Sequence, residues 1–277
     1  MSTATLTAPS PSPAPVVGEA KIGLRAHLRH IGALTRRNIL WIKQDPESMF
    51  DAILMPLVFT LLFVYVFGGA IAGKGNQQEY VNYVVPGLMA MMGMNMATGV
   101  GTGFNQDFQT GVMDRFRSLP IARSSVLIAK IMVEILRLII AVGVLLAVGF
   151  ALGLSVSNVP GLFASIGLSI LFGSSLMWIF LTLGVTMKSA QAIQAMGFLV
   201  MMPLQFGSSI FTPTSTMPGW LQAFTDYNPI STLADASRAL CNGGPLTHGL
   251  TWTLIWTVAI TVVMAPVAIH KFRTKSS

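Results

Sequence analysis

The chain has 277 residues, of which 53% are hydrophobic and only 10% are charged. A soluble domain usually carries about 25% charged residues, so the composition excludes an ordinary soluble protein and indicates a membrane protein. The single cysteine excludes an intrachain disulfide and a cysteine-based metal cluster.

Residues 1–18 are mostly Ser, Thr, Ala and Pro, with almost no large apolar side chain. This composition predicts a disordered cytoplasmic tail, because too little apolar surface is available for burial. The tail also lacks the apolar centre of a signal peptide, so no cleaved leader is expected.

Residues 19–45 predict an amphipathic helix on the inner membrane surface. Leu24, Leu28 and Ile31 fall on one helical face, and basic residues lie beside them. The helix is expected to end before Pro46. The alternative, a packed helix of a small N-terminal domain, has too little surrounding chain to form a core.

Residues 46–277 contain long stretches without any charged residue. A bilayer core about 30 Å thick needs roughly 20 apolar residues in a helix, and each of these stretches is long enough. The longest of them holds a turn cluster at 155–161 and therefore fits two crossings. The sequence predicts an all-α membrane domain of six transmembrane helices, near residues 52–71, 80–104, 138–154, 160–187, 190–210 and 249–270.

The basic residues predict the orientation of these spans. Of the 17 Lys and Arg residues, all but Lys74 and Arg238 lie on one side of the predicted membrane. The positive-inside rule therefore places both termini in the cytoplasm, in a multi-pass protein of the cell (cytoplasmic) membrane. Anionic lipid head groups account for the net charge of +7, so no nucleic-acid partner is expected.

Met89, Met92 and Met96 recur at helical spacing on the second predicted span. Two interpretations stay open: packing among helices and lipid, or an adaptable apolar wall along a substrate path, which the flexible methionine side chain suits. Gly93 and Gly101 on the same span predict close helix approach, including at a dimer interface.

The cytoplasmic loop at about 105–124 mixes large apolar and charged residues in a short stretch closed by Pro120. Such a stretch can dock into a groove of a partner, with Val112, Phe116 and Leu119 as apolar anchors. The alternative is a solvated helix that only obeys the positive-inside rule. The residues alone favour neither interpretation.

The segment from Gly111 to Arg123 resembles the cytoplasmic segment of ABC-2 type transporter permeases, where a glycine, an acid-basic pair, a Leu-Pro step and an arginine precede the third helix. Its lead-in at Asp107 looks more like the daunorubicin and doxorubicin resistance permeases. In this family the segment is a coupling helix that contacts the ATP-binding subunit. The resemblance implies these ATPase-coupling residues: Gly111, Val112, Asp114, Arg115, Phe116, Arg117, Leu119, Pro120 and Arg123.

A second resemblance lies at about 211–245, where prolines break any continuous helix. Non-helical backbone at membrane depth persists only where protein or a water-filled cavity satisfies it. In the family this region dips back into the membrane from the outside, between helices 5 and 6. The implied outer re-entrant or gate residues are Pro213, Pro218, Trp220, Asn228, Pro229 and Arg238. The alternative is an ordinary outer loop with an interfacial tryptophan.

No nucleotide-binding loop of the form Gly-x-x-x-x-Gly-Lys-Ser/Thr occurs, so ATPase activity is not expected on this chain. Neither a metal site nor a catalytic set of polar residues is evident within the spans. Glu134 and Arg137 predict an ion pair at the start of the third span, with a proton relay as the alternative. An ion-coupled transporter usually keeps a charged residue near mid-membrane, and the uncharged stretches disfavour that class.

The resemblance implies the permease subunit of an ATP-driven exporter of hydrophobic or amphiphilic compounds such as drugs. Export of lipid, glycolipid or polysaccharide is the alternative. The implied partners are an ATP-binding subunit that carries ATP and Mg, a second permease in a homodimer or heterodimer, and membrane lipids.

Overall fold

The computed structural model describes Gly32, Thr35 and residues 46–71, 76–112 and 123–275. The predicted tail at 1–18 and nearly all of the predicted surface helix at 19–45 lie outside these residues, and both stay predictions. Within the described ranges the regular elements are all helical, as the sequence predicts for an all-α protein.

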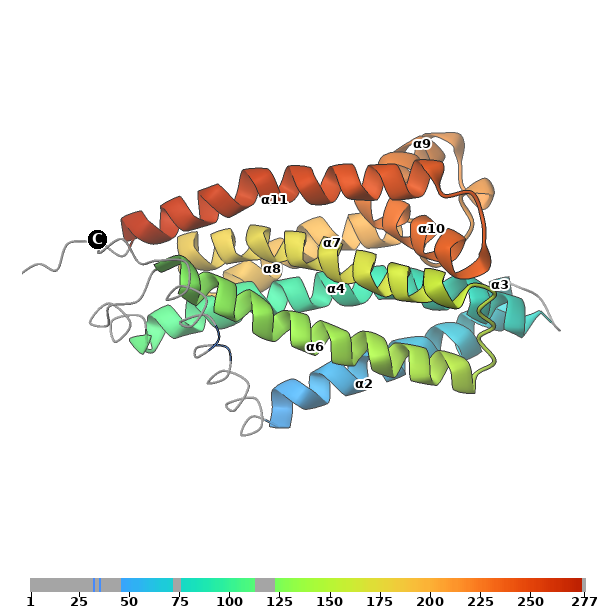
Figure 1. The fold of residues 1–277 in the computed structure, drawn as a ribbon, viewed down its shortest axis with the longest axis horizontal. Helices are drawn as coiled ribbons and strands as arrows, with labels where there is room; N and C mark the ends of the chain where they lie inside the picture. The colour runs from blue at the N-terminus through green and yellow to red at the C-terminus, as the bar shows by residue number, and fades with distance from the viewer. Residues whose placement is uncertain (1–31, 33–34, 36–45, 72–75, 113–122, 276–277) are drawn as a thin grey trace, which may run out of the picture.

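Among the described residues, four helices of 28 to 33 residues and several shorter ones follow one another along the chain (Figure 1). The elements are α2 (Pro46–Leu62), the π-helical turn η1 (Phe63–Phe67), α3 (Gly68–Ile71), α4 (Gln77–Gln109), α6 (Arg123–Ala151), α7 (Val159–Thr186), α8 (Ala190–Phe206), the turn η2 (Thr214–Thr216), α9 (Gly219–Tyr227), α10 (Pro229–Asn242) and α11 (Thr247–Lys275). The long helices lie side by side, with α9 and α10 at one end of the bundle and the C-terminus at the other.

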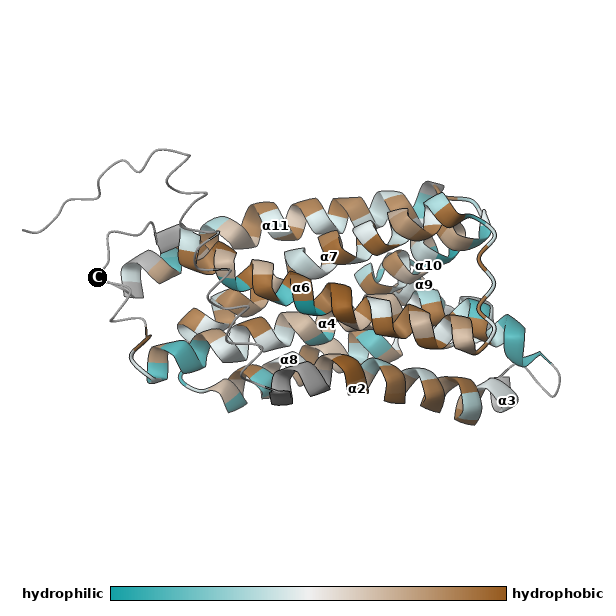
Figure 2. Cartoon of the chain, turned by 60° about the horizontal axis from the view of Figure 1, so that its bottom comes forward, coloured by the Kyte–Doolittle hydropathy of each residue, from teal (hydrophilic) through white to brown (hydrophobic). Residues whose placement is uncertain are grey.

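Four of the helices are long and apolar enough to cross a membrane, judged by length and composition: 77–109, 125–151, 159–186 and 248–272. Two shorter apolar helices, Ala52–Phe67 and Ala190–Phe206, coincide with the first and fifth predicted spans. Apolar residues cover these helices along their length (Figure 2). The membrane class is thus confirmed, and the count of six spans stays a prediction.

Helix α4 lies at the centre and packs against α6, α7, α8 and α10. Its contact with α7 is backbone to backbone: a Cβ on Gly93 would lie 3.2 Å from the Cα of Gly173, and one on Gly101 would lie 2.6 Å from the carbonyl oxygen of Phe180. The predicted close approach of helices is confirmed, and both glycines serve a contact within one chain.

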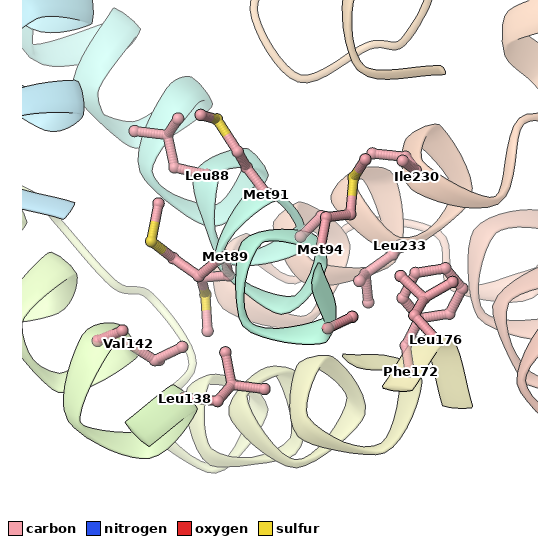
Figure 3. Close-up of a cluster of buried hydrophobic side chains, with 14 of the residues drawn as sticks. Leu88, Met89, Met91, Met94, Leu138, Val142, Phe172, Leu176, Ile230 and Leu233 are labelled. Carbon is pink, nitrogen blue, oxygen red and sulfur yellow. The ribbon is translucent and has the colours of Figure 1, made fainter. Parts of the chain in front are cut away.

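Apolar side chains from several helices fill the space around α4 (Figure 3). Met89 lies on the side of Leu138 from α6, and Met94 lies on the side of Ile230 and Leu233 from α10. Short α10 therefore contributes to the same core as the long helices, which fixes its position against the end of the bundle.

The third long helix begins earlier than the sequence suggests. Helix α6 starts at Arg123 rather than near Leu138, so Lys130, Glu134 and Arg137 all lie within it. Glu134 lies about three turns into the helix, at 3.6 residues per turn, so its predicted place at the start of the third helix is wrong. Ion pairs with Asp107 and Glu134 compensate the charges of Lys130 and Arg137 within the helix.

Candidate functional site

The predicted coupling segment is described only at its two ends. Gly111 follows α4 with φ +72, a left-handed conformation that favours glycine after a helix, and Val112 is half-buried. Arg123 begins α6. The remaining predicted coupling residues lie outside the described residues: Asp114, Arg115, Phe116, Arg117, Leu119 and Pro120.

An ion pair joins the two helices that hold this segment. The Lys130 Nζ on α6 lies 2.7 Å from the Asp107 Oδ2 on α4. Gly103 makes room for it, since a Cβ there would lie 3.4 Å from the Lys130 Nζ. The pair connects the last turn of α4 to the first half of α6.

A second ion pair lies one turn deeper along α6. The Arg137 Nη1 lies 2.9 Å from the Glu134 Oε1, and the Glu134 side chain is almost fully buried. A Cβ on Gly99 of α4 would lie 3.9 Å from the Glu134 Oε2. The predicted pairing of Glu134 with Arg137 is confirmed, but inside the bundle.

Helix α4 also holds the turn between α7 and α8 at this end. The Asn105 Nδ2 donates to the carbonyl oxygens of Gly184, at 3.1 Å, and Met187, at 2.9 Å. The Gln109 Nε2 donates to the carbonyl of Lys188 at 3.2 Å. Helix α6, the end of α7 and the turn that follows it thus contact α4 within two turns of the coupling segment.

The three predicted path methionines lie in different surroundings. Met89 and Met92 are fully buried in the core, whereas Met96 is only partly buried. In this conformation Met89 and Met92 pack against other helices, and only Met96 borders an open surface.

The half of α4 nearer the coupling segment keeps one open face that sequence reasoning missed. Asn95 and Gln106 are exposed, and Thr98 and Thr102 between them are half-buried. The Thr102 hydroxyl bonds within its own helix, to the Gly99 carbonyl at 3.1 Å, whereas the Asn95 amide has no hydrogen-bond partner among the described residues. Asn95 is an uncharged amide inside an apolar stretch, so a prediction based on charged residues does not reveal it.

At the opposite end of the bundle, side chains satisfy the carbonyls of a non-helical turn after α8. Asn228, only 2% exposed, caps α10 and donates through Nδ2 to the carbonyl oxygens of Leu204, at 2.7 Å, and Gly207, at 3.0 Å. The Tyr83 hydroxyl donates to the Ser209 carbonyl at 2.7 Å, and the Tyr80 hydroxyl to the Phe211 carbonyl at 3.3 Å.

Arg238 is the centre of this network, which we call the Arg238 network. Its Nη2 donates to the carbonyl oxygens of Ser209, at 2.7 Å, and Ile210, at 2.9 Å. Its Nε donates to the Tyr83 carbonyl at 2.8 Å, and the guanidinium lies 3.7 Å from the centroid of the Tyr83 ring. Asp235 provides the counter-charge at 2.7 Å. The residue thus ties α10, α4 and the turn after α8 together.

Gly87 on α4 leaves the space that this network needs. A Cβ there would lie 2.7 Å from the Arg238 Nη2 and 2.9 Å from the Ile210 carbonyl oxygen. Sequence reasoning predicted Asn228 and Arg238 but missed Gly87, Tyr80 and Tyr83, because their partners lie far away in the chain.

The other residues that were predicted for the outer region lie at helix starts or on the surface. Pro213 precedes η2, Pro218 precedes α9 and Pro229 is the first residue of α10, so the prolines mark where short helices begin. Trp220 is exposed on α9, away from the Arg238 network. Cys241 on α10 is buried beside the Ser165 hydroxyl.

Comparison with known proteins gives consistent matches. Residues 29–241 match the ABC-2 type transporter family. The chain is 34% identical over 242 residues to the daunorubicin resistance ABC transporter permease protein of Streptomyces coeruleorubidus, covering 87% of this chain and 85% of the relative. It is 27% identical over 239 residues to a protein of Mycobacterium tuberculosis named "Probable doxorubicin resistance ABC transporter permease protein", covering 85% of each. The family match spans both the coupling end and the Arg238 network.

Proposed function

Since the chain belongs to the ABC-2 type transporter family, we propose that it is the membrane subunit of an ATP-driven exporter of hydrophobic or amphiphilic compounds. A separate ATP-binding subunit supplies ATP, Mg and hydrolysis. The observation that carries the proposal is the 34% identity, over 87% of this chain, to a drug-resistance permease.

The proposed topology has six spans with cytoplasmic termini. The continuous helical stretch 46–71 is about 39 Å long at 1.5 Å per residue, enough for a bilayer core of about 30 Å. The end of α11 lies beside the end of α4 and the start of α6 (Figure 1), and the basic residues of the loops gather there, which supports a cytoplasmic position for this end of the bundle.

The length of α8 supports a re-entrant outer segment. With 17 residues it is about 26 Å long, slightly shorter than the bilayer core, so the turn that follows it lies at membrane depth. Such a turn has no water to satisfy its carbonyls. Side chains donate the hydrogen bonds that lipid cannot give to these carbonyls, from Tyr80, Tyr83, Asn228 and Arg238.

The proposed coupling path starts at 111–123, where the ATP-binding subunit would dock. The Asp107–Lys130 ion pair makes α4 and α6 move together when the ATP-binding subunit displaces this segment. The hydrogen bond from Asn105 to the Met187 carbonyl makes the turn before α8 follow them. Because these contacts are polar and directional, they keep their geometry when the helix ends move.

The proposed cargo path runs along the open face of α4. Asn95 is exposed near the middle of this span, and an unsatisfied amide in lipid is unfavourable by several kcal/mol. We infer that water, cargo or a second permease subunit covers it, in a homodimer or heterodimer. Met96 gives the path an adaptable apolar edge.

The test is reconstitution of the chain with its ATP-binding subunit in vesicles. An amphiphile such as daunorubicin should stimulate ATP hydrolysis and be transported. Stimulation by a lipid, glycolipid or polysaccharide, with no response to the amphiphile, would instead assign the alternative cargo class.

A further inference from the structure

Helix α9 presents an aromatic surface that the Arg238 network does not use. Trp220, Phe224 and Tyr227 are 75%, 44% and 56% exposed. Their spacing of four and then three residues places them on one side of the helix. On the opposite side Thr225 is buried, and its hydroxyl donates to the Gly207 carbonyl at 3.1 Å. One face of α9 is therefore attached to the protein, and the aromatic face is not.

The aromatic surface continues onto the first turns of α11. The rings of Tyr227 and Trp252 meet edge to face, with centroids 5.2 Å apart, and the Trp256 Nε1 donates to the Tyr227 carbonyl at 3.2 Å. Between Trp256 and Val267 the exposed side chains of α11 are apolar, among them Val258 and Val262. The surface thus joins the apolar face of a candidate membrane span at its end.

We propose that the α9 aromatic surface, formed by Trp220, Phe224 and Tyr227, binds lipid at the outer boundary of the membrane. Tryptophan and tyrosine rings favour this boundary, because one edge is polar and the rest is apolar. The continuity with the lipid-facing side of α11 favours lipid over a second protein as the occupant. The outward position rests on the proposed six-span topology.

Lipid binding by α9 has a consequence for the outer gate. Thr225 of α9 and Asn228, which follows it, both donate to the Gly207 carbonyl at the end of α8. Lipid binding that holds α9 at the membrane boundary therefore also fixes the depth of the end of α8 in the membrane. Helix α9 thus stabilises the position of the non-helical turn after α8.

The experiment uses tryptophan fluorescence in vesicles of phosphatidylcholine brominated at either shallow or deep acyl positions. A variant with phenylalanine at the other four tryptophans keeps Trp220 as the only one. Shallow bromine should quench its emission at least twofold more strongly than deep bromine, and aqueous acrylamide should quench it weakly. Strong acrylamide quenching without any effect of bromine would overturn the proposal.

A second measurement avoids multiple substitutions. In the otherwise natural chain, Trp220→Ala should remove part of the emission that shallow bromine quenches, whereas removal of only bromine-insensitive emission would contradict lipid contact. High-yield crosslinking between copies through Trp220→Cys, in a Cys241→Ser chain, would assign the surface to a second copy. Shallow quenching of Trp220 only by lipid brominated in the inner leaflet would keep the lipid surface but refute the proposed topology.

Discussion

Replacing Arg238 with methionine removes the donor that joins α10, α4 and the turn after α8. Among the described residues, the Ile210 carbonyl receives its side-chain hydrogen bond from Arg238. A buried carbonyl left unsatisfied is unfavourable by about 1–3 kcal/mol. The contact of the guanidinium with the Tyr83 ring adds about 1 kcal/mol, while the half-exposed Asp235 adds little. The expected loss is about 3 kcal/mol of the free energy that keeps α10 in place.

The buried Cys241 reports this loss directly, because it lies one turn from Arg238 on α10. Burial raises the pKa of its thiol, which further slows reaction in the closed state. If maleimide reacts only after local opening, a change of about 3 kcal/mol raises the labelling rate ~100-fold, since 1.4 kcal/mol is a factor of ten. Arg238→Lys should give a smaller increase, because an ammonium cannot reproduce the planar fork.

The assay is the rate of Cys241 labelling by a small maleimide in intact vesicles, with Asp226→Asn on exposed α9 as the matched control. An Arg238→Met chain that inserts normally but is labelled within twofold of the control rate would refute the role of Arg238 in holding α10.

Three further predictions follow from named contacts. Gly87→Ala should lower the free energy of unfolding by about 1–3 kcal/mol, because the added methyl group overpacks against Arg238. Gly167→Ala is the control, since the space around its Cβ is open. Equal thermal stability of the two variants would contradict the geometry. Lys130→Met should leave folding nearly unchanged, because its pair is partly exposed, yet reduce cargo-stimulated ATP hydrolysis by about half or more; full stimulation would argue against this coupling path. Asn95→Leu should weaken cargo stimulation with little change in basal hydrolysis, and an unchanged dose response in the same ATPase assay would remove Asn95 from the cargo path.

The sequence predicted a helix well where the length and apolarity of a single segment were enough to identify it. Long uncharged stretches gave the second, fourth and sixth spans, because length and apolarity decide whether a helix can cross a bilayer. The third helix was predicted to begin too late, because Lys130 lies among charged residues that are typical of a loop. Its partner Asp107 lies 23 residues away on the facing helix, and the glycine that makes room is on that helix too.

The Arg238 network could be predicted only in part. Prolines predicted where helices break, and the family resemblance pointed to Asn228 and Arg238. The carbonyls they satisfy could not be deduced, because the Tyr83 carbonyl lies 155 residues from Arg238 and the Ser209 carbonyl lies 29 residues from it. Backbone acceptors carry no sequence signal, so such a network becomes visible only when the fold brings the segments together.

The most direct test of the central claim is ATP-driven transport by the reconstituted complex. Vesicles that contain this chain and its ATP-binding subunit should transport daunorubicin only when ATP and Mg are present. Phe116→Ala, in the predicted coupling segment, should reduce both co-purification and transport, since removing a central aromatic anchor is commonly unfavourable by about 2 kcal/mol. Thr5→Ala in the N-terminal tail is the control. Transport driven by an ion gradient without the ATP-binding subunit would contradict the account.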